Sequence, residues 1–316
     1  MSHLGREPPY MGRTWHSRRQ MAAADTTFNQ HRNLLFTLAY EILGSVHDAE
    51  DVVQESWLAW SSVEADRIEH PKAYLVRIAV RQALARSRRL RAAREDYVGP
   101  WLPEPLLTEA DPTEADPAEA VSRAEELTFG LLVVLETLSP LERAAFVLRE
   151  GFGYEHAEIA RVLERSPAAA RQLIHRAREH VQARRPRFPA DPDLARQAAE
   201  RFLAATLGGH LGDLMDVLAP DVTLWTDGGG AVRAALRPVS GAAKVARLLA
   251  KLGPRYGHLR TRWLPGSQPT ALLTAEDELL AVLVLDLDAV TARARHIYGI
   301  VNPEKLTHLS SATSCR

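Results

Sequence analysis

The sequence predicts a multidomain protein in which two all-α domains, a helical bundle and a helix-turn-helix domain, precede an α+β half-barrel. Three observations predict this order. Apolar residues recur at helical spacings over residues 28–94 and again over residues 119–187. A stretch rich in proline and acid separates these two blocks, and β-favouring runs appear only late in the chain. A chain of 316 residues is long enough for two or three such domains.

The charge of the chain is strongly segregated, although its formal total is only -1. Residues 72–94 carry eight basic side chains and no acidic one, whereas residues 95–122 carry acids and no base. The balanced total therefore does not exclude nucleic-acid binding. The single cysteine, Cys315, excludes an internal disulfide, and no apolar run approaches a membrane span, so we expect a cytoplasmic protein. We expect tails at residues 1–27, which are polar and disordered, and at residues 310–316.

The first predicted domain, residues 28–95, begins with an apolar helix that stops at Gly44 and continues with DAEDVVQESWLAW. We expect Asp48 to be the N-cap of this second helix. The helix dipole alone favours acids at such an N-terminus, but their density on the outer face also suggests docking to a partner. The residues of this acidic face are Asp48, Glu50, Asp51, Gln54 and Glu55.

A third helix, PKAYLVRIAVRQALARSRRLRAAR, carries a basic stripe with an aromatic residue at its start. Arginines on one face can follow phosphates while a tyrosine ring stacks on a base, as binding to a partly melted DNA strand requires. The alternative is a solubilising face with a half-buried tyrosine. The residues of this basic face are Lys72, Tyr74, Arg77, Arg81 and Arg88.

Residues 96–118 form an acidic linker whose prolines exclude one regular element. Trp101 and the neighbouring leucines are too apolar for a merely solvated tether. Part of the linker should therefore dock on another part of the chain.

The second predicted domain, residues 119–187, ends in two short helices joined by a turn of a few residues. Ser139 and Glu142 predict a capping box, and Ser166 predicts the start of the last helix. A solvated surface helix would explain the last helix in isolation, but its context is that of a helix-turn-helix, whose second helix enters the major groove of DNA. The residues of this recognition face are Ala168, Arg171, Gln172, His175 and Arg176.

Residues 191–309 contain two helices, a series of β-favouring runs and one further helix, GAAKVARLLAKL. The late strands favour a curved sheet wrapping around the earlier helices, with room for a cavity. Asp227, His258 and His296 could act there as acid/base groups, but Asp227 directly precedes three glycines and is equally explained as a turn former. We therefore predict no catalytic residue, no metal and no cofactor.

In order and spacing, these segments resemble the extracytoplasmic-function (ECF) sigma factors of bacterial RNA polymerase. DAEDVVQESWLAW resembles the helix that binds the polymerase clamp, PKAYLVRIAVRQALARSRR the helix that captures the minus-10 promoter element, and SPAAARQLIHRARE the minus-35 recognition helix. YVGPWLPEPLL, DGGG at 227–230 and NPEKL at 302–306 are similar to the marks of a subgroup with a fused C-terminal SnoaL-like domain. The chain departs from the family pattern at Arg81, where many relatives outside this subgroup have asparagine, and at Ala85, where an aspartate is usual.

The resemblance implies a sigma region 2 bundle, a sigma region 4 helix-turn-helix and a SnoaL-like, cone-shaped half-barrel over the three predicted domains. It implies that the chain binds core RNA polymerase, at the beta-prime clamp and the beta flap, and directs initiation at promoter DNA. It further implies that the third domain regulates the sigma domains. We expect the regulatory contacts at Trp101, Asp227, Asn302, Pro303, Lys305 and Leu306.

Two other functions stay open. SnoaL-like folds also host cyclases and isomerases, so the third domain could bind a small molecule or act as an enzyme fused to a helix-turn-helix regulator. An ordinary repressor that uses only the helix-turn-helix would leave the acidic and basic faces of the first domain unexplained. An unidentified small-molecule ligand in the cavity of the third domain is also compatible with a sigma factor. We expect no membrane partner.

Overall fold

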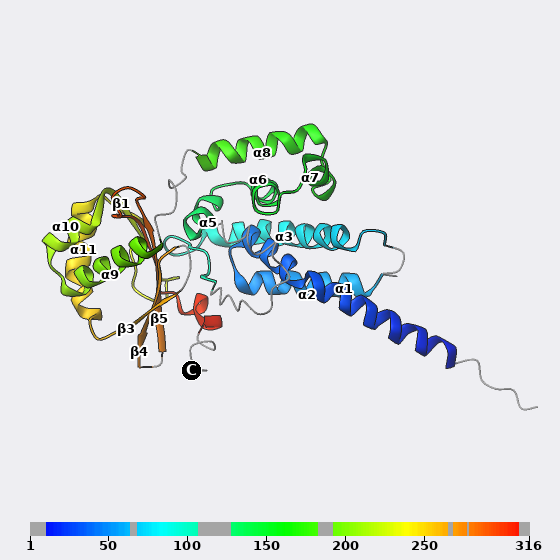
Figure 1. Ribbon diagram of the computed structural model, residues 1–316, viewed down its shortest axis with the longest axis horizontal. Helices are drawn as coiled ribbons and strands as arrows, with labels where there is room; N and C mark the ends of the chain where they lie inside the picture. The colour runs from blue at the N-terminus through cyan, green and yellow to red at the C-terminus, as the bar shows by residue number, and fades with distance from the viewer. Residues whose placement is uncertain are drawn as a thin grey trace, which may run out of the picture.

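The computed structural model describes residues 11–63, 68–106, 128–182, 192–264, 268–276 and 278–309. For residues 11–24 and residue 192, only the backbone is described. Figure 1 shows two distinct parts. The helices α1 to α8 form one part, and a curved sheet with the helices α9 to α11 forms the other. Two helical domains followed by an α+β domain are the predicted fold class, which is thereby confirmed.

The first helical domain is a bundle around one apolar core. Its helices are α1 (Met11–Leu43), α2 (Val46–Ser61) and α3 (Pro71–Glu95). Gly44 follows α1 with a φ of +70°, a left-handed conformation that favours glycine. Trp60 of α2 is fully buried in the core, whereas Arg77 and Arg81 of α3 are exposed. The apolar spacing of both helices predicts this division.

Two details of the bundle differ from the sequence prediction. Helix α1 begins at Met11, so the expected tail over residues 1–27 is wrong for residues 11–27. No proline or glycine lies between Arg13 and Leu43, so nothing in the sequence interrupts the helix there. The N-cap of α2 is Ser45 rather than Asp48, because Ser45 Oγ accepts the backbone N–H of Asp48 at 3.2 Å. Residues 1–10, the linker from residue 107 and the expected tail at 310–316 lie outside the described ranges.

The second helical domain carries the helix-turn-helix. Its elements are α5 (Phe129–Leu135), α6 (Pro140–Phe146), the π-helical turn η2 (Val147–Gly151), α7 (His156–Val162) and α8 (Pro167–Gln182). The capping box of Ser139 and Glu142 is confirmed at the start of α6. The Oγ atom of Ser166 accepts the N–H of Ala169 at 3.2 Å, as expected at the start of α8. The turn before α8 contains Glu164 at a φ of +53°.

The two helical domains share one continuous hydrophobic core. Helix α3 contacts α6 and α7, and helix α1 contacts α6 and η2. Figure 1 shows α8 on the side of α6 that faces away from α3. We call this packing of the two helical domains the closed arrangement.

The third domain contains a six-stranded sheet in the order β2-β1-β6-β5-β4-β3, in which only β1 and β6 pair in parallel. The strands are β1 (Leu218–Asp227), β2 (Val239–Ser240), β3 (Arg260–Leu264), β4 (Thr270–Ala275), β5 (Glu278–Leu287) and β6 (Ala294–Ile300). The helices are α9 (Pro192–Gly208), α10 (Leu211–Val217) and α11 (Ala242–Leu252), with the 3-10 turns η3 (Gly253–Tyr256) and η4 (Pro303–Lys305).

Both faces of the sheet are covered. Leu285 on the inner face packs with Phe202 of α9 in a core that the three helices close. Tyr298 on the outer face belongs to a separate core with Leu102 of the linker and Leu306 after η4. The chain that connects the two helical domains is therefore part of the core of the third domain.

Candidate functional site

The acidic face of α2 divides into bound and available carboxylates. Arg86 of α3 pairs with Asp48 at 3.2 Å and with Asp51 at 2.7 Å, and its side chain is only 18% exposed. Glu50 is exposed and pairs with Arg32 of α1 at 2.7 Å. Asp48 and Asp51 thus hold α2 on α3.

The remaining members of the acidic face, Gln54 and Glu55, lie further along α2. Gln54 is exposed and lines a cleft of about 400 Å³ between α1 and α2, together with the apolar Phe28 and Trp57. The rings of Phe28 and Trp57 meet edge to face, with their centroids 5.1 Å apart. A protein partner would therefore meet a mainly polar cleft, with the Trp57 ring in its lining, beside the acidic face.

The linker reaches the start of this same helix. The Oε2 atom of Glu104 accepts the backbone N–H of Val46 at 2.6 Å, and Tyr40 donates its hydroxyl to the carbonyl of Glu104 at 2.6 Å. Glu104 also donates its own N–H to the carbonyl of Gly44 at 2.8 Å. The carboxylate of Glu104 thus caps α2 together with Ser45. Sequence reasoning missed this residue because these partners lie 58 to 64 residues earlier, although it belongs to the quoted motif YVGPWLPEPLL.

The basic face of α3 is exposed along most of its length. Lys72, Arg77, Arg81 and Arg88 point outward, while Tyr74 is partly buried against Trp60, with a ring separation of 6.0 Å. The guanidinium of Arg77 lies over the Tyr74 ring at 5.4 Å. Arg81 pairs with Glu164 of the helix-turn-helix at 3.3 Å. One member of the basic face is therefore engaged by the second helical domain.

All five residues of the recognition face lie on the exposed side of α8. They differ in how they are held. Arg176 pairs with Glu142 of α6 at 2.9 Å, and His175 lies 3.5 Å from Glu179. Burial raises the pKa of Glu142, but hydrogen bonds from Ser139 and Arg176 outweigh it, so its pKa is lower than usual. Arg176 therefore also supports the packing of α8 on α6.

Buried charges hold the closed arrangement together. Arg143 of α6 is 3% exposed and donates from Nε to the carbonyl of Glu41 in α1 at 2.7 Å. Arg143 also pairs with Glu136, which in turn pairs with Arg94 of α3. The Oε2 atom of Glu41 is buried without a hydrogen bond, and burial raises the pKa of this carboxyl well above its usual value, although Arg143 opposes the shift.

Trp101 of the linker lies where the three domains meet. Its ring lies 3.4 Å from the guanidinium of Arg94 and 3.9 Å from the ammonium group of Lys305. Gly44 lies so close that a methyl group there would come within 2.9 Å of the indole and 3.0 Å of Glu136. The first domain and the C-terminal segment thus converge on the Trp101 side chain, and Glu136 of the second domain approaches Gly44 beside it.

Asp227 links this junction to the sheet. The side chain is fully buried at the end of β1 and accepts hydrogen bonds from the Tyr97 hydroxyl at 2.5 Å and the Leu102 N–H at 2.8 Å. It also pairs with Lys305 at 2.7 Å and accepts the N–H of Gly229 at 3.1 Å. Burial lowers the pKa of Lys305 to about 8, although Asp227 opposes the shift. We call the set formed by Tyr97, Trp101, Asp227 and Lys305 the linker junction.

The other expected regulatory residues lie beside the linker junction. Asn302 donates from Nδ2 to the Tyr97 hydroxyl at 3.0 Å, and Leu306 is buried against Leu102 in the outer core. Pro303 is exposed and only begins η4. The sequence reasoning missed Tyr97, which stands at the start of the quoted linker motif and whose aromatic ring marks it as a candidate for docking.

The three groups proposed as acid/base residues do not converge. Asp227 is enclosed by its partners, and His258 is exposed after η3. His296 pairs with Asp286 at 2.8 Å on the outer face of the sheet, opposite Thr223, which lies four residues before Asp227. Within the described ranges, no three His, Cys, Asp or Glu side chains are placed to hold a metal ion.

Comparisons with known proteins place both helical domains in one family. The family model of sigma-70 region 2 matches residues 27–93, and that of sigma-70 region 4 matches residues 129–181. The chain is 39% identical over 294 residues to the ECF RNA polymerase sigma factor SigJ of Mycobacterium tuberculosis, covering 89% of this chain and 92% of that protein. It is 28% identical over 282 residues to the probable ECF sigma factor SigI of the same species, covering 88% and 93%.

The same similarity extends to structure. The crystal structure of Mycobacterium tuberculosis SigJ superposes with a TM-score of 0.69 and 36% sequence identity, covering 89% of this chain and 98% of that one. The match therefore includes the third domain. No helix among the described residues is long and apolar enough to span a bilayer.

Proposed function

This chain belongs to the ECF family of RNA polymerase sigma factors, and from that premise we propose how its surfaces divide the task. The chain directs promoter-specific transcription initiation through sigma regions 2 and 4, and it carries a fused C-terminal domain. Its relatives are sigma factors, so we assign the bond chemistry to the polymerase and no catalytic residue to this chain. It would act in the cytoplasm, where the polymerase works.

The exposed part of the acidic face would bind the polymerase clamp. Gln54 is exposed and Glu55 is half-buried without a described ion pair, whereas Glu50 pairs with Arg32 at the surface and Asp48 and Asp51 are engaged by Arg86. Charges at the rim of an interface chiefly set orientation and the rate of encounter. Trp57, which lines the cleft beside Gln54, would supply apolar contact area. The contact of the beta flap would fall to the second helical domain.

The two DNA elements would be contacted by different helices. Arg171 and Gln172 are exposed on α8 and have the donor and acceptor groups that suit guanine and adenine edges in the major groove. Lys72, Arg77 and Arg88 on α3 would follow the phosphates of the minus-10 strand. We assign Arg176 a phosphate contact as well as its packing role, since its side chain remains 57% exposed.

The proposal that the third domain regulates the sigma domains rests on one observation, the ion pair between Arg81 and Glu164 at 3.3 Å. It brings the turn before α8 against the basic face of α3. The minus-35 and minus-10 elements lie about 25 base pairs apart, or about 85 Å along B-DNA at 3.4 Å per base pair. The closed arrangement cannot reach both elements at once, so the helical domains must separate on the promoter. The linker junction, which ties the first helical domain to the third, and the hydrogen bond from the Phe129 N–H of the second helical domain to Gln268 of the third, at 2.8 Å, would together oppose that separation.

Run-off transcription with core polymerase tests this proposal. We expect Arg171→Glu to abolish promoter-specific transcripts, while Arg201→Glu, an equally exposed change on α9, leaves them unchanged. A chain that ends at Ala190 should differ from the full chain in initiation, because it lacks Asp227 and Lys305. Transcription that is unaffected by Arg171→Glu would contradict the assigned recognition face. Equal activity of the truncated and full chains would contradict the regulatory role.

A further inference from the structure

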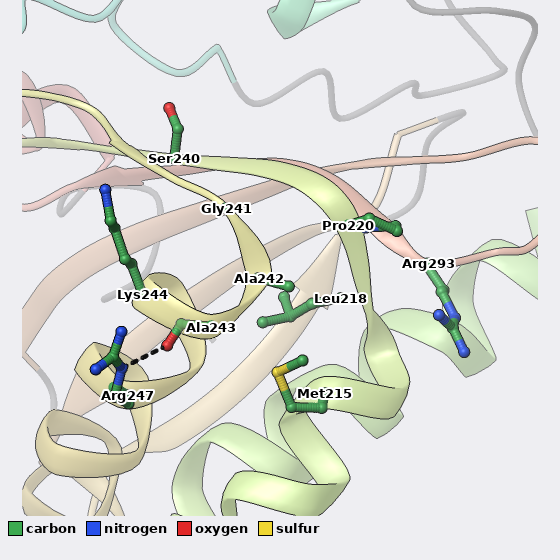
Figure 2. A pocket seen from close by; sticks show the side chains of 10 residues that line it. All are labelled: Met215, Leu218, Pro220, Ser240, Gly241, Ala242, Ala243, Lys244, Arg247 and Arg293. Atoms are coloured by element: carbon green, nitrogen blue, oxygen red, sulfur yellow. Dashed lines mark hydrogen bonds between the residues drawn. The ribbon is translucent and has the colours of Figure 1, made fainter.

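A groove opens in the third domain at the end of the sheet away from the linker junction. It lies where β1 begins, beside the start of α11 and the turn before β6, and has a volume of about 460 Å³. Figure 2 shows Leu218 and Ala242 in its floor and Met215 at its lower edge. Most of the exposed lining is therefore apolar. Pockets that bind small organic ligands have this size and character.

The rim of the groove is basic. Lys244, Arg247 and Arg293 line it, and no acidic residue does among the described ones. Figure 2 shows Lys244 and Arg293 on opposite sides of the apolar floor, while Arg247 donates only to the carbonyl of Ala243, at 2.9 Å. None of the three pairs with a described carboxylate, whereas Arg295, two residues beyond Arg293, pairs with Asp221 at 3.1 Å. The positive charges of Lys244, Arg247 and Arg293 are thus available to bind an anionic ligand.

The backbone adds to the positive potential of the groove. Helix α11 has 11 residues, and its N-cap is Gly241, which has a φ of +96° and offers no side-chain acceptor. The first amide groups of a helix have no intrahelical acceptor and carry a partial positive charge. Ala242 and Ala243, whose amides open the helix, both line the groove.

We propose that this groove binds a small organic anion, a molecule with an apolar body and one carboxylate, sulfonate or phosphate group. The floor formed by Met215, Leu218 and Ala242 would bury the apolar body. The charged group would contact Lys244 or Arg293 at one side of this floor. A neutral molecule of the same shape would leave these cations unpaired and bind more weakly.

The sheet gives such a ligand a route to the linker junction, and this part of the inference depends on the proposed regulatory function. Strands β1 and β6 run parallel, so both begin at the groove and both end near the linker junction, β1 at Asp227 and β6 just before Asn302. Their pairing is irregular between Leu218 and Thr223, next to the groove. Such bulges are common beside functional sites. A ligand that repositions the start of β1 would act on the strand that holds Asp227.

The binding step can be tested on the full chain with 8-anilino-1-naphthalenesulfonate, whose fluorescence reports burial. N-phenyl-1-naphthylamine has the same rings without the sulfonate and is the matched neutral probe. We expect the sulfonate to bind at least about tenfold more tightly than the neutral probe. Lys244→Glu combined with Arg293→Glu should remove this preference. The variant should fold, since an acid in the first turn of α11 suits the helix dipole.

Two further measurements locate the probe. Lys251→Glu, at the other end of α11, should leave sulfonate binding unchanged. Hydrogen exchange of the Ala242 and Ala243 amides should slow when the sulfonate is bound. Equal binding of the two probes, no binding of the sulfonate, or full binding to the double variant would each overturn the site. These measurements do not involve transcription. They therefore test ligand binding separately from the proposed regulatory function.

Discussion

The guanidinium of Arg94 lies 3.4 Å from the centre of the Trp101 ring, so the helix with the basic face is held by the linker itself. Lys305 approaches the same ring to 3.9 Å. A cation over an indole contributes about 0.5–2 kcal/mol, depending on its exposure. One aromatic side chain therefore bridges the first helical domain and the C-terminal segment.

We expect Trp101→Leu to lower the free energy of unfolding by about 1–4 kcal/mol, because it removes both cation–π contacts and part of the buried area. Trp101→Phe should lower it less, since a ring remains between the two cations. Urea denaturation of the full chain measures both values. Equal losses in the two variants would show that the cations do not contribute through the ring.

The pair formed by Lys305 and Asp227 should make stability depend on pH. Burial lowers the pKa of Lys305 from 10.5 to about 8, so the folded chain binds fewer protons than the unfolded chain between those values. Stability should therefore rise with pH from about 8, and the titration of Lys305 should add no pH dependence below that pH. Urea midpoints between pH 7 and 9.5 should show this rise in the wild type and not in Lys305→Met. A rise of the same size in the variant would contradict the assignment.

A double-mutant cycle isolates the contact itself. Asp227→Asn alone leaves a buried ammonium group, and Lys305→Met alone leaves a buried carboxylate, so each should destabilise the chain by about 3–5 kcal/mol. The combined variant should lose less than the sum of the two, since no uncompensated charge remains. Strict additivity would mean that the two groups do not interact.

Glu41 should produce the opposite dependence on pH. Its pKa is raised by burial, so the folded chain holds a proton that the unfolded chain releases above pH 4.5, and stability falls as the pH rises from there toward the raised pKa. Glu41→Gln keeps the shape and cannot ionise, so it should be more stable than the wild type at neutral pH. Thermal unfolding from pH 5 to 8 measures the difference. A variant that is less stable at every pH would show that the carboxylate is needed.

The local structure of the chain could largely be predicted from the sequence, and the contacts between domains could not. The capping box of Ser139 and Glu142 and the outward face of α8 follow from spacings of three and four residues. The partners of Glu104 and Arg94 depend on which surfaces meet, and no local pattern encodes that. Asp48 shows the limit within one helix, because Ser45 offers an equally good cap and takes the position. The motif around Trp101 predicted that the linker docks, but not that it docks on both the first and the third domain.

Some acidic residues of α2 hold the fold together and others do not, so substitutions at the two kinds of residue should affect stability and polymerase binding differently. Asp48 is paired with Arg86 and mostly buried, whereas Glu55 has no described ion pair and lies on the same helix. We expect Asp48→Asn to lower the melting temperature, because it weakens the packing of α2 on α3, and to change the affinity for core polymerase only through that loss.

Glu55→Arg should do the reverse. It places a cation where the clamp would meet the acidic face, so it should weaken binding to core polymerase by about 1–2 kcal/mol, or roughly five- to thirtyfold, through repulsion between like charges. Its melting temperature should fall less than that of Asp48→Asn, since the half-buried Glu55 has no described ion pair to lose. Titration of labelled sigma factor with core polymerase, beside a thermal melt, measures both. If Glu55→Arg binds normally while Asp48→Asn loses affinity without losing stability, the clamp contacts the buried end of the helix and the assignment must be reversed.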